Sequence, residues 1–375
     1  MTKTTLAAAL CGTLFLAFPA YAEDTLRLSV TSALPGHHTA LSVFRKHFQA
    51  EVSRRMEDAG GTPPVWVEMH DGSLARPGGV LEALEDDLVL FGIVSVNEEV
   101  DRLPLQNLTY RMPFTTEDCA VVAEAYHNVH ETVEGMTGPV EKAGQMYLAP
   151  ITSDAYNFIS VQKITNPGDV RGIPIGIVDK VEGWLSGVEG APVPIRADLI
   201  ASRLEAGVLI GALMPDTDMR RLGLKEQADH YTRTGFGAQV PYIVTVNARL
   251  LADLPEAVRD AVWVTASAFT VPAAKAYCAA GESALEKLKE QGIRTAKLLK
   301  SRRGQWAGAL APLAQSWAKR NDDAGWPGTA AVEAYMQELK AAGVHLTRDW
   351  SRPASPGALP VLTPPAEQVS EAPHH

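Results

Sequence analysis

Cysteine is scarce in this chain of 375 residues: there are three, and Cys11 lies in an apolar N-terminal run. The scarcity excludes a small fold held together by several disulfides. Two alternatives stay open for Cys119 and Cys278, which are either one disulfide or two buried thiols. Long apolar runs are scarce too. After the N-terminal one, none reaches the roughly 18 residues of a transmembrane helix, so no direct membrane insertion of the mature protein is expected.

Clustered positive charge is also missing. Lys and Arg together number 34 against 44 Asp and Glu, which gives a formal net charge of −10. No dense Lys/Arg block offsets this excess, so nucleic acids and anionic membranes repel the chain. We therefore expect no nucleic-acid partner.

Patterns that carry catalysis or bind metals are weak. His127 and His130, with Glu131 and Glu134, lie on a predicted helix, but no fourth metal ligand accompanies them, and a solvated helix face explains them as well. The serines lack a nucleophile-elbow pattern, and Cys119 has no readable His/Asn partners. The sequence thus predicts no enzyme, no metal site and no cofactor.

Both ends of the chain look like segments outside the folded core. Residues 1–22 combine Lys3, an apolar run over 6–18 and the small-residue site Ala20-Tyr21-Ala22, which is typical of a secretory signal peptide. This predicts export from the cytosol. Residues 350–375 are rich in proline and poor in aromatics, which predicts a disordered tail.

Between the ends, short apolar strands alternate with helices, which predicts an α/β fold with largely parallel sheets. The segments "LEALEDDLVLFG" (81–92) and "RLEAGVLIGAL" (203–213) share one plan, a helix end followed by a buried strand. A unit used once in each half indicates two similar lobes, and small ligands bind in clefts between lobes.

One long helix is predicted over residues 254–291. It would span about 57 Å at 1.5 Å per residue, which is longer than one lobe. Pro272 should kink it midway, and Gly292 ends it. We expect this helix to lie across both lobes as a spine.

Several motifs occur in an order and spacing that resemble a known family. They are "GSLARPGGVLEAL", "PGDVRGIPIGI", "GAPVPI", "LEAGVLIGA" and "VPYIVTVNARLLADLPEAVRDAV". Together they resemble the solute-binding proteins of tripartite ATP-independent periplasmic (TRAP) transporters of the DctP type, over about residues 24–343. The resemblance implies a two-lobed periplasmic binding protein, type II-like, with a long kinked helix spanning both lobes. It also implies delivery of a small organic solute, an organic acid or a related compound, to a TRAP membrane permease.

The resemblance further implies how the chain divides. Lobe I would comprise residues 23–147 plus about 240–271. Lobe II and the spine helix would comprise residues 148–239 plus about 272–343.

The chain departs from the family pattern at the expected ligand site. Family members usually read Leu-Lys-Gly-x-Lys-Ile-Arg-Val where this chain reads "VRGIPIGI" (170–177), so Gly176 stands where the family arginine clamps a ligand carboxylate. The family pattern Gly-Val-Val-Asp-Gly-x-Glu is replaced by "GVLIGAL" (207–213), in which both acids are apolar. We expect Gly176 to leave room for a changed ligand.

Two arginines are candidates to replace the clamp. Arg196 follows the strand beside the expected cleft, although it can also form a surface pair with Asp198. Arg111 precedes "MPF" (112–114), which resembles the family's Leu-Pro-Phe loop, and its alternative role is a structural ion pair.

Four further residues complete the predicted site. Trp184 either stacks on a ligand or caps the core. His37 and His38 follow the first strand, where an imidazole can bind an anion or remain a loop residue. Asn247, in the family's Val-Asn-x-x-Leu segment, holds either the ligand or the local backbone.

Glu98, Glu99 and Asp101 leave two further alternatives, attraction of a cationic solute or a charged surface turn. At the level of function two hypotheses also remain. One is a transport receptor with a concave pocket near Gly176. The other is a sensor or interaction protein of the same fold, with its cleft filled by Trp184 and other side chains.

Overall fold

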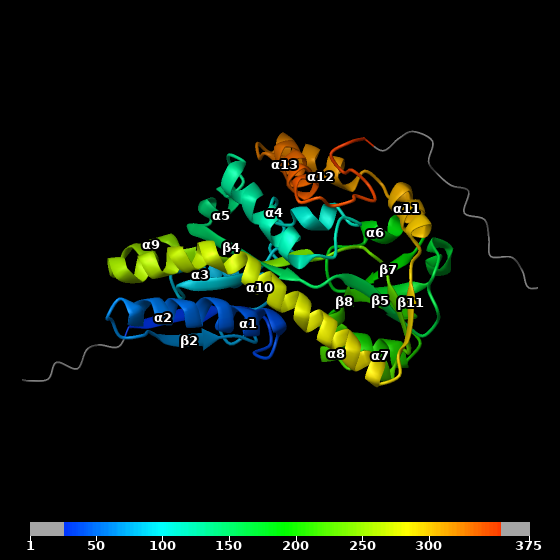
Figure 1. The fold of residues 1–375 in the computed structure, drawn as a ribbon, viewed down its shortest axis with the longest axis horizontal. Helices are drawn as coiled ribbons and strands as arrows, with labels where there is room; N and C mark the ends of the chain where they lie inside the picture. Colours follow the sequence, from blue (N-terminus) through cyan, green and yellow to red (C-terminus); the bar gives the residue numbers. More distant parts are fainter. Residues whose placement is uncertain (1–25, 354–375) are drawn as a thin grey trace, which may run out of the picture.

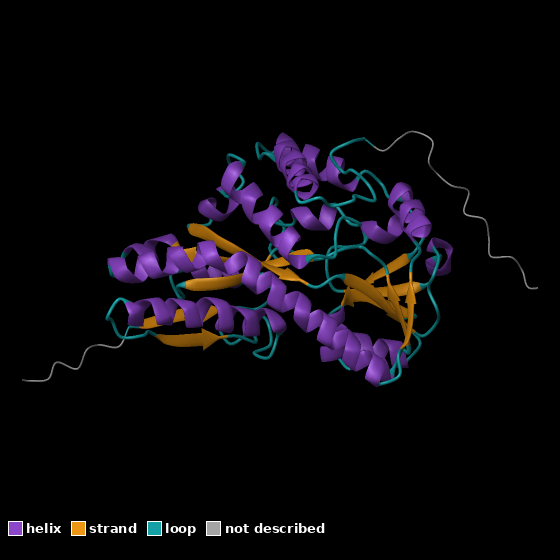
Figure 2. Cartoon of the chain, viewed as in Figure 1, coloured by secondary structure: helices purple, strands orange, loops and turns teal. Residues whose placement is uncertain are grey.

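The computed structural model describes residues 26–353. The predicted signal peptide and all but the first few residues of the predicted proline-rich tail lie outside this range. Within it the chain forms two lobes, each built on its own β-sheet with helices packed around it (Figures 1 and 2). The predicted two-lobed α/β fold is confirmed.

The first sheet has the strand order β2-β1-β3-β10-β4. Its strands are β1 (Arg27–Thr31), β2 (Val65–Met69), β3 (Phe91–Ser95), β4 (Gln145–Ser153) and β10 (Gln239–Asn247). Its helical elements are α1 (Thr39–Phe44), the π-helical turn η1 (Arg45–Gln49), α2 (Ala50–Asp58), α3 (Val80–Glu85), α5 (Gly138–Lys142) and α9 (Ala248–Ala252). Leu28 and Val30, two apart on β1, are fully buried, as the period-two pattern requires.

The second sheet has the strand order β11-β9-β5-β8-β6-β7. Its strands are β5 (Tyr156–Ser160), β6 (Pro174–Ile177), β7 (Ala191–Pro194), β8 (Gly211–Pro215), β9 (His230–Arg233) and β11 (Arg294–Lys297). The helices of this part are α6 (Gly183–Ser186), α7 (Ile200–Glu205) and α8 (Asp216–Arg221), with 3₁₀ turns η3 (Pro167–Val170), η4 (Ala197–Leu199) and η5 (Leu224–Glu226).

Both sheets are mixed, so the prediction of largely parallel sheets is wrong in this respect. β1 runs parallel to β2 and β3, and β6 runs parallel to β7 and β8. β10 is antiparallel to β3 and β4, and β5 is antiparallel to β8 and β9. Each of these antiparallel pairs contains β5 or β10, the two strands that follow a crossing between the lobes.

The repeated unit seen in the sequence forms the same structure in each lobe. Helix α3 leads to β3, and helix α7 leads to β8. Each helix is followed by a left-handed residue, Asp87 (φ 57°) and Gly207 (φ 67°), and the next amide donates back into the helix, Leu88 to Ala83 and Val208 to Arg203. This is the hydrogen-bond pattern of a Schellman stop.

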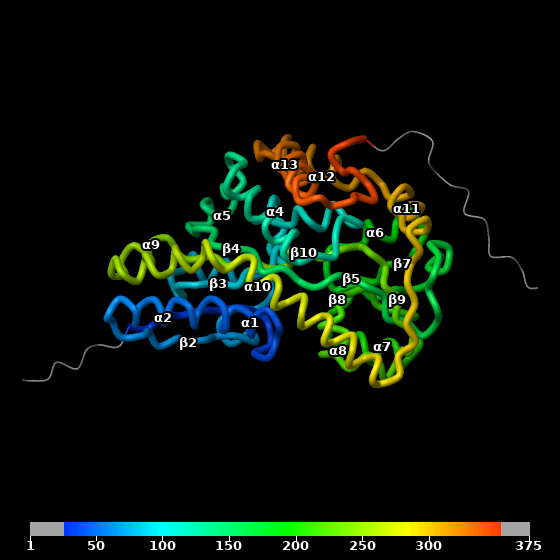
Figure 3. Tube along the Cα trace, viewed as in Figure 1, coloured from blue at the N-terminus to red at the C-terminus, as the bar shows by residue number. Residues whose placement is uncertain are grey.

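Three segments of the described chain run from one sheet to the other. Two are backbone crossings, between β4 and β5 and between β9 and β10, and the third is helix α10 (Glu256–Glu290), which runs from one lobe to the other (Figure 3). The predicted spine helix is therefore confirmed to within about two residues at either end, with Pro272 inside it. Gly292 follows its end with a φ of 82°.

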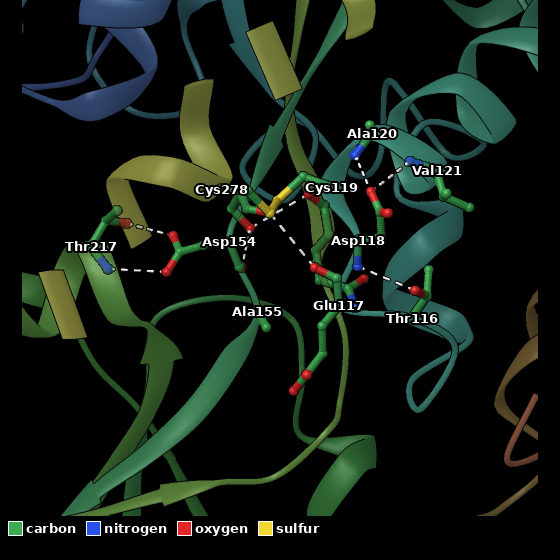
Figure 4. Close-up of a disulfide and its surroundings, with 12 residues drawn as sticks. Thr116, Glu117, Asp118, Cys119, Ala120, Val121, Asp154, Ala155, Thr217 and Cys278 are labelled. Carbon is green, nitrogen blue, oxygen red and sulfur yellow. Dashed lines mark hydrogen bonds between the residues drawn. A yellow bond between two sulfur atoms is a disulfide. The ribbon is translucent and has the colours of Figure 1, made fainter. Parts of the chain in front are cut away.

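A disulfide joins α10 to helix α4 (Cys119–Thr132) near these crossings (Figure 4). The Cα atoms of Cys119 and Cys278 are 5.9 Å apart. The sequence left a disulfide and two free thiols open, and the structure contains the disulfide. Asp118 caps α4, because its Oδ1 accepts hydrogen bonds from the amides of Ala120 and Val121 at 2.9 and 3.2 Å.

The C-terminal part of the described chain covers one side of both lobes (Figure 1). It comprises α11 (Lys300–Ala309), α12 (Leu313–Asp323) and α13 (Gly328–Ala341), with the 3₁₀ turn η2 (Leu108–Arg111) beneath α12. Asn128 of α4 donates to Glu338 of α13 at 2.7 Å. Trp350 donates from its indole nitrogen to the carbonyl of Pro113 at 2.8 Å, which fixes the end of this segment.

No helix between residues 26 and 353 is both long enough and apolar enough to cross a membrane.

Candidate functional site

A cavity of about 860 Å³ lies between the two lobes. From the first lobe it is lined by the loops after β1, β2 and β3, and by Tyr242 of β10. From the second lobe it is lined by the loops after β6 and β7 and by α8. Five of these loops follow the carboxyl ends of strands that pair in parallel, which is where α/β proteins bind small ligands.

Acidic side chains outnumber basic ones in the lining of the cleft. The carboxylates are Asp71, Glu98, Glu99, Asp179, Asp198 and Asp218; the arginines are Arg76, Arg196 and Arg221. Two of the three arginines are already paired. Arg196 contacts Asp198 at 2.8 Å at the exposed rim, and Arg221 contacts Asp218 at 2.8 Å in a mostly buried pair. Arg76 is exposed and forms no ion pair or side-chain hydrogen bond with the described residues.

His38 and Asp218 face each other across the cleft. His38 caps α1: its Nδ1 accepts from the amide of Ala40 at 3.2 Å, which places the ring proton on Nε2, 3.7 Å from Asp218 Oδ1. Burial lowers the pKa of His38 to about 4, although Asp218 partly opposes this. The imidazole is therefore neutral at neutral pH. Its ring stands edge-on to Tyr242 with the centroids 5.7 Å apart.

A second contact across the cleft centres on Asp179. Asn97, two residues past β3, donates to Asp179 Oδ1 at 3.0 Å, and the hydroxyl of Tyr156 donates to the other carboxylate oxygen. The hydroxyl of Tyr110 lies 2.9 Å from that of Tyr156. Burial raises the pKa of Asp179 to about 6, while its hydrogen-bond donors act in the opposite direction.

Backbone strain shapes the loop that follows β2. Asp71 and Gly72 are both left-handed, with φ of 58° and 75°. Such a conformation is uncommon for a residue with a side chain and recurs where a loop has a functional position. Gly78 in the same loop is also left-handed, and a Cβ there would lie 3.5 Å from the carbonyl of Glu98. The loop bearing Arg76 thus lies directly beside the segment that carries Glu98.

Two of the residues predicted for the site, His38 and Arg196, line the cleft. Gly176, Trp184, Arg111, His37 and Asn247 are not among its lining residues. His37 is exposed next to His38. For all seven residues, contact with a solute stays a prediction.

Two apolar side chains, Leu209 and Ile195, lie close to Gly176. A Cβ at Gly176 would lie 2.8 Å from Cδ1 of Leu209 and 3.4 Å from Cγ2 of Ile195. Leu209 is fully buried, and Ile195 separates Gly176 from the cleft that it lines. A solute could therefore use the space next to Gly176 only if Leu209 or Ile195 moved.

Trp184 and Asn247 have well-defined partners elsewhere. Trp184 is buried, donates to the carbonyl of Tyr110 at 2.8 Å and stacks on Phe236, so it caps the core. Asn247 caps α9 by accepting from the amide of Leu250, and it donates to the carbonyl of Leu84 at 2.6 Å. Arg111 is mostly buried at the end of η2, where burial lowers its pKa, and it forms no ion pair with any described residue.

The cleft contains residues that the sequence analysis did not select. These are Asp71, Arg76, Asp179, Asp218, Arg221 and Tyr242. Asp71 and Asp179 lie two residues past the ends of β2 and β6, and that position at the carboxyl end of a strand was the available signal. Glu98 and Glu99 were considered, and they also line the cleft, whereas Asp101 does not. Between residues 26 and 353 no group of three or more His, Cys, Asp or Glu is arranged to hold a metal ion.

Solved structures share this architecture. A TRAP periplasmic solute-binding protein from Desulfovibrio salexigens has a TM-score of 0.74 and 17% identity, with 84% of this chain and 96% of that chain covered; its ligand-binding site holds the C-terminus of a symmetry mate. A marine metagenome TRAP protein specific for aromatic acids, in complex with 3-hydroxybenzoate, gives 0.73 and 17%, covering 84% and 98%. A Bordetella bronchiseptica protein with bound mandelate gives 0.70 and 20%, covering 84% and 99%.

No curated protein is significantly similar to the chain in sequence. Residues 43–321 match the family described as bacterial extracellular solute-binding protein, family 7 (DctP). This match spans most of the chain and includes every residue that lines the cleft from Asp71 to Tyr242. The protein belongs to the DctP family of bacterial extracellular solute-binding proteins.

Proposed function

We propose that this protein is the receptor of a TRAP transporter, which captures a small organic solute in the cleft between its lobes and delivers it to the membrane permease. Family membership provides the solute-binding role. The observation that carries the proposal is the cavity of about 860 Å³ with charged side chains from both lobes. Its volume lies in the range of about 300–1,000 Å³ that small-molecule sites occupy.

The same cavity favours a transport receptor over a sensor or interaction protein with a filled cleft. In that second hypothesis, Trp184 would occupy the cleft. Trp184 instead lies in the core against Phe236 and Tyr110. The cleft therefore has room for a solute.

The solute would be bound by closure of the lobes. Two backbone crossings and α10 run between the two sheets, and the segment α11–α13 packs on both lobes (Figure 1). We place the hinge in the two crossings, where few backbone angles need to change. Asn97–Asp179 and His38–Asp218 are polar contacts that span the cleft. A solute held between the lobes adds contacts that exist only in the closed form, which shifts the population toward it.

The proposed location is the periplasm. The sequence predicts a secretory signal over residues 1–22. The Cys119–Cys278 disulfide supports an oxidising compartment, since such bonds persist outside the cytosol.

A thermal-shift screen with a matched pair of variants tests this proposal. Ala197 lines the cleft, and Ala197→Trp should fill it, whereas Ala341→Trp changes an exposed position on α13. Solutes from a broad library of organic acids, sugars and amino-acid derivatives that raise the Tm of the parent should also raise that of Ala341→Trp. They should no longer raise that of Ala197→Trp. A solute that stabilises all three proteins equally would show that it binds outside the cleft.

A further inference from the structure

The charge in the cleft constrains the chemistry of the solute. Six carboxylates face three arginines, and His38 is neutral. Arg196 and Arg221 are each held by a carboxylate of the same cleft. After these pairs are formed, four carboxylates and one arginine remain. A cleft lined mostly by one sign of charge concentrates ligands of the opposite sign.

None of the remaining carboxylates forms an ion pair within residues 26–353, although Arg102 lies near enough to Glu99 to act against the rise in the pKa of this carboxyl that burial causes. Asp71 and Glu98 are exposed, and neither accepts a side-chain hydrogen bond or forms an ion pair with any described residue. Glu99 is 3% exposed and accepts from the amide of Leu81 at 3.3 Å, and it too forms no ion pair within the described chain. Asp179 is satisfied by Asn97 and Tyr156, which are neutral donors.

The remaining arginine lies on the same side of the cleft. Arg76 is exposed in the loop whose Gly78 approaches the backbone of Glu98. An unpaired guanidinium can bind one carboxylate through two parallel hydrogen bonds. The first lobe therefore presents one site for a carboxylate beside at least two acidic groups.

From this arrangement we infer that the solute is a zwitterion, an organic acid that also carries a cationic nitrogen. Arg76 binds its carboxylate, and the exposed Asp71 and Glu98 bind its ammonium group. This inference rests on the proposed function, because it names the solute class for the same cleft. A second carboxylate in the solute would face these acids without a cation, which costs binding free energy.

Solutes matched in length test the inference. We would measure binding of succinate, 4-aminobutyrate and 1,4-diaminobutane by calorimetry, together with the corresponding series of five and six carbons. The same measurement would be made on α-amino acids and their decarboxylated amines. In at least one of the series of four, five or six carbons, the amino acid should bind about tenfold or more tightly than both the diacid and the diamine. In the α-amino acid series, the amino acid should bind about tenfold or more tightly than its decarboxylated amine. A tenfold difference in affinity corresponds to ~1.4 kcal/mol of binding free energy, which is the cost expected for one unmatched charge in the site.

Variants separate the two halves of the solute. Glu98→Gln should weaken binding of the amino acid about tenfold, and Arg76→Gln should do the same. Glu82→Gln on the exposed face of α3 and Arg27→Gln on β1 are matched controls away from the cleft and should leave affinity unchanged. The fold of each variant is checked by its melting temperature without solute.

The possible outcomes are distinct. Tightest binding of a diacid would overturn the inference and leave the proposed function intact. Tightest binding of a diamine would overturn the role of Arg76 and the zwitterion with it. If no solute of any charge class bound the parent, both the inference and the proposed receptor function would be contradicted.

Discussion

Single residues show where the sequence was informative and where it was not. Gly176 could be recognised because it stands where the resemblance places the family arginine. The sequence could not show that Leu209, 33 positions further along the chain, fills the neighbouring space. That contact depends on how β6 and β8 pair, which local patterns do not specify.

Asp179 gives a prediction on pH at the same scale. Burial raises its pKa to about 6, whereas an unfolded aspartate has a pKa near ~3.9. Between these values the folded protein binds more protons than the unfolded chain. The contribution of Asp179 to the free energy of unfolding is therefore present below about pH 4 and is lost as the pH rises through 6.

Asp179→Asn removes this dependence. The free energy of unfolding of the variant, relative to that of the parent, should be higher at pH 7 than at pH 4.5 by ~2 kcal/mol. Urea unfolding of both proteins at the two pH values measures the difference. Asp198→Asn serves as a control that should show almost no difference between the two pH values. Arg196 lowers the pKa of the exposed Asp198, so this carboxylate is ionised in the folded and in the unfolded chain at both pH values. Equal stability differences for Asp179→Asn at both pH values would refute an elevated pKa.

Whole elements were more predictable than single contacts. The spine helix could be delimited closely, because Pro255 and Gly292 mark its ends in the sequence. The direction of strands was not predictable in the same way. β10 and β5 are antiparallel to their neighbours because the chain crosses between lobes beside them, and alternation of strands with helices carries no information about such crossings.

Helix α10 contains a close contact that gives a second prediction. A Cβ at Gly281 would lie 2.5 Å from Cβ of Asp154. Asp154 follows β4 in the crossing between the lobes and accepts a hydrogen bond from the hydroxyl of Thr217 (Figure 4). A glycine inside a helix lowers the free energy of unfolding by ~0.5–1 kcal/mol relative to alanine. The close approach of Asp154 explains why glycine nevertheless occupies position 281.

Two glycine-to-alanine variants separate these effects. Gly281→Ala should destabilise the protein by ~1–3 kcal/mol through overpacking. Gly304→Ala in α11, where no atom lies within 4 Å of the added Cβ, should stabilise it by ~0.5–1 kcal/mol. Denaturant unfolding measures both. The close approach of Asp154 would be disproved if Gly281→Ala were as stabilising as Gly304→Ala.

At the scale of the whole molecule, the repeated helix-strand unit was enough to predict two lobes and a cleft between them. It was not enough to identify most of the cleft residues. Asp218 and Arg221 lie on α8, Tyr242 lies on β10, and Arg76 lies in a loop, so their meeting depends on how the lobes face each other. The two predicted residues that do line the cleft, His38 and Arg196, both follow the carboxyl end of a strand.

Small-angle X-ray scattering tests the central claim, that the lobes close on a solute held between them. The radius of gyration should be measured for the parent without solute and with a saturating concentration of the solute that binds tightest. Closure about the two crossings should reduce the radius of gyration of the parent. Ala197→Trp at the same solute concentration should show no reduction. An unchanged radius for a parent that calorimetry shows to be saturated would contradict the account.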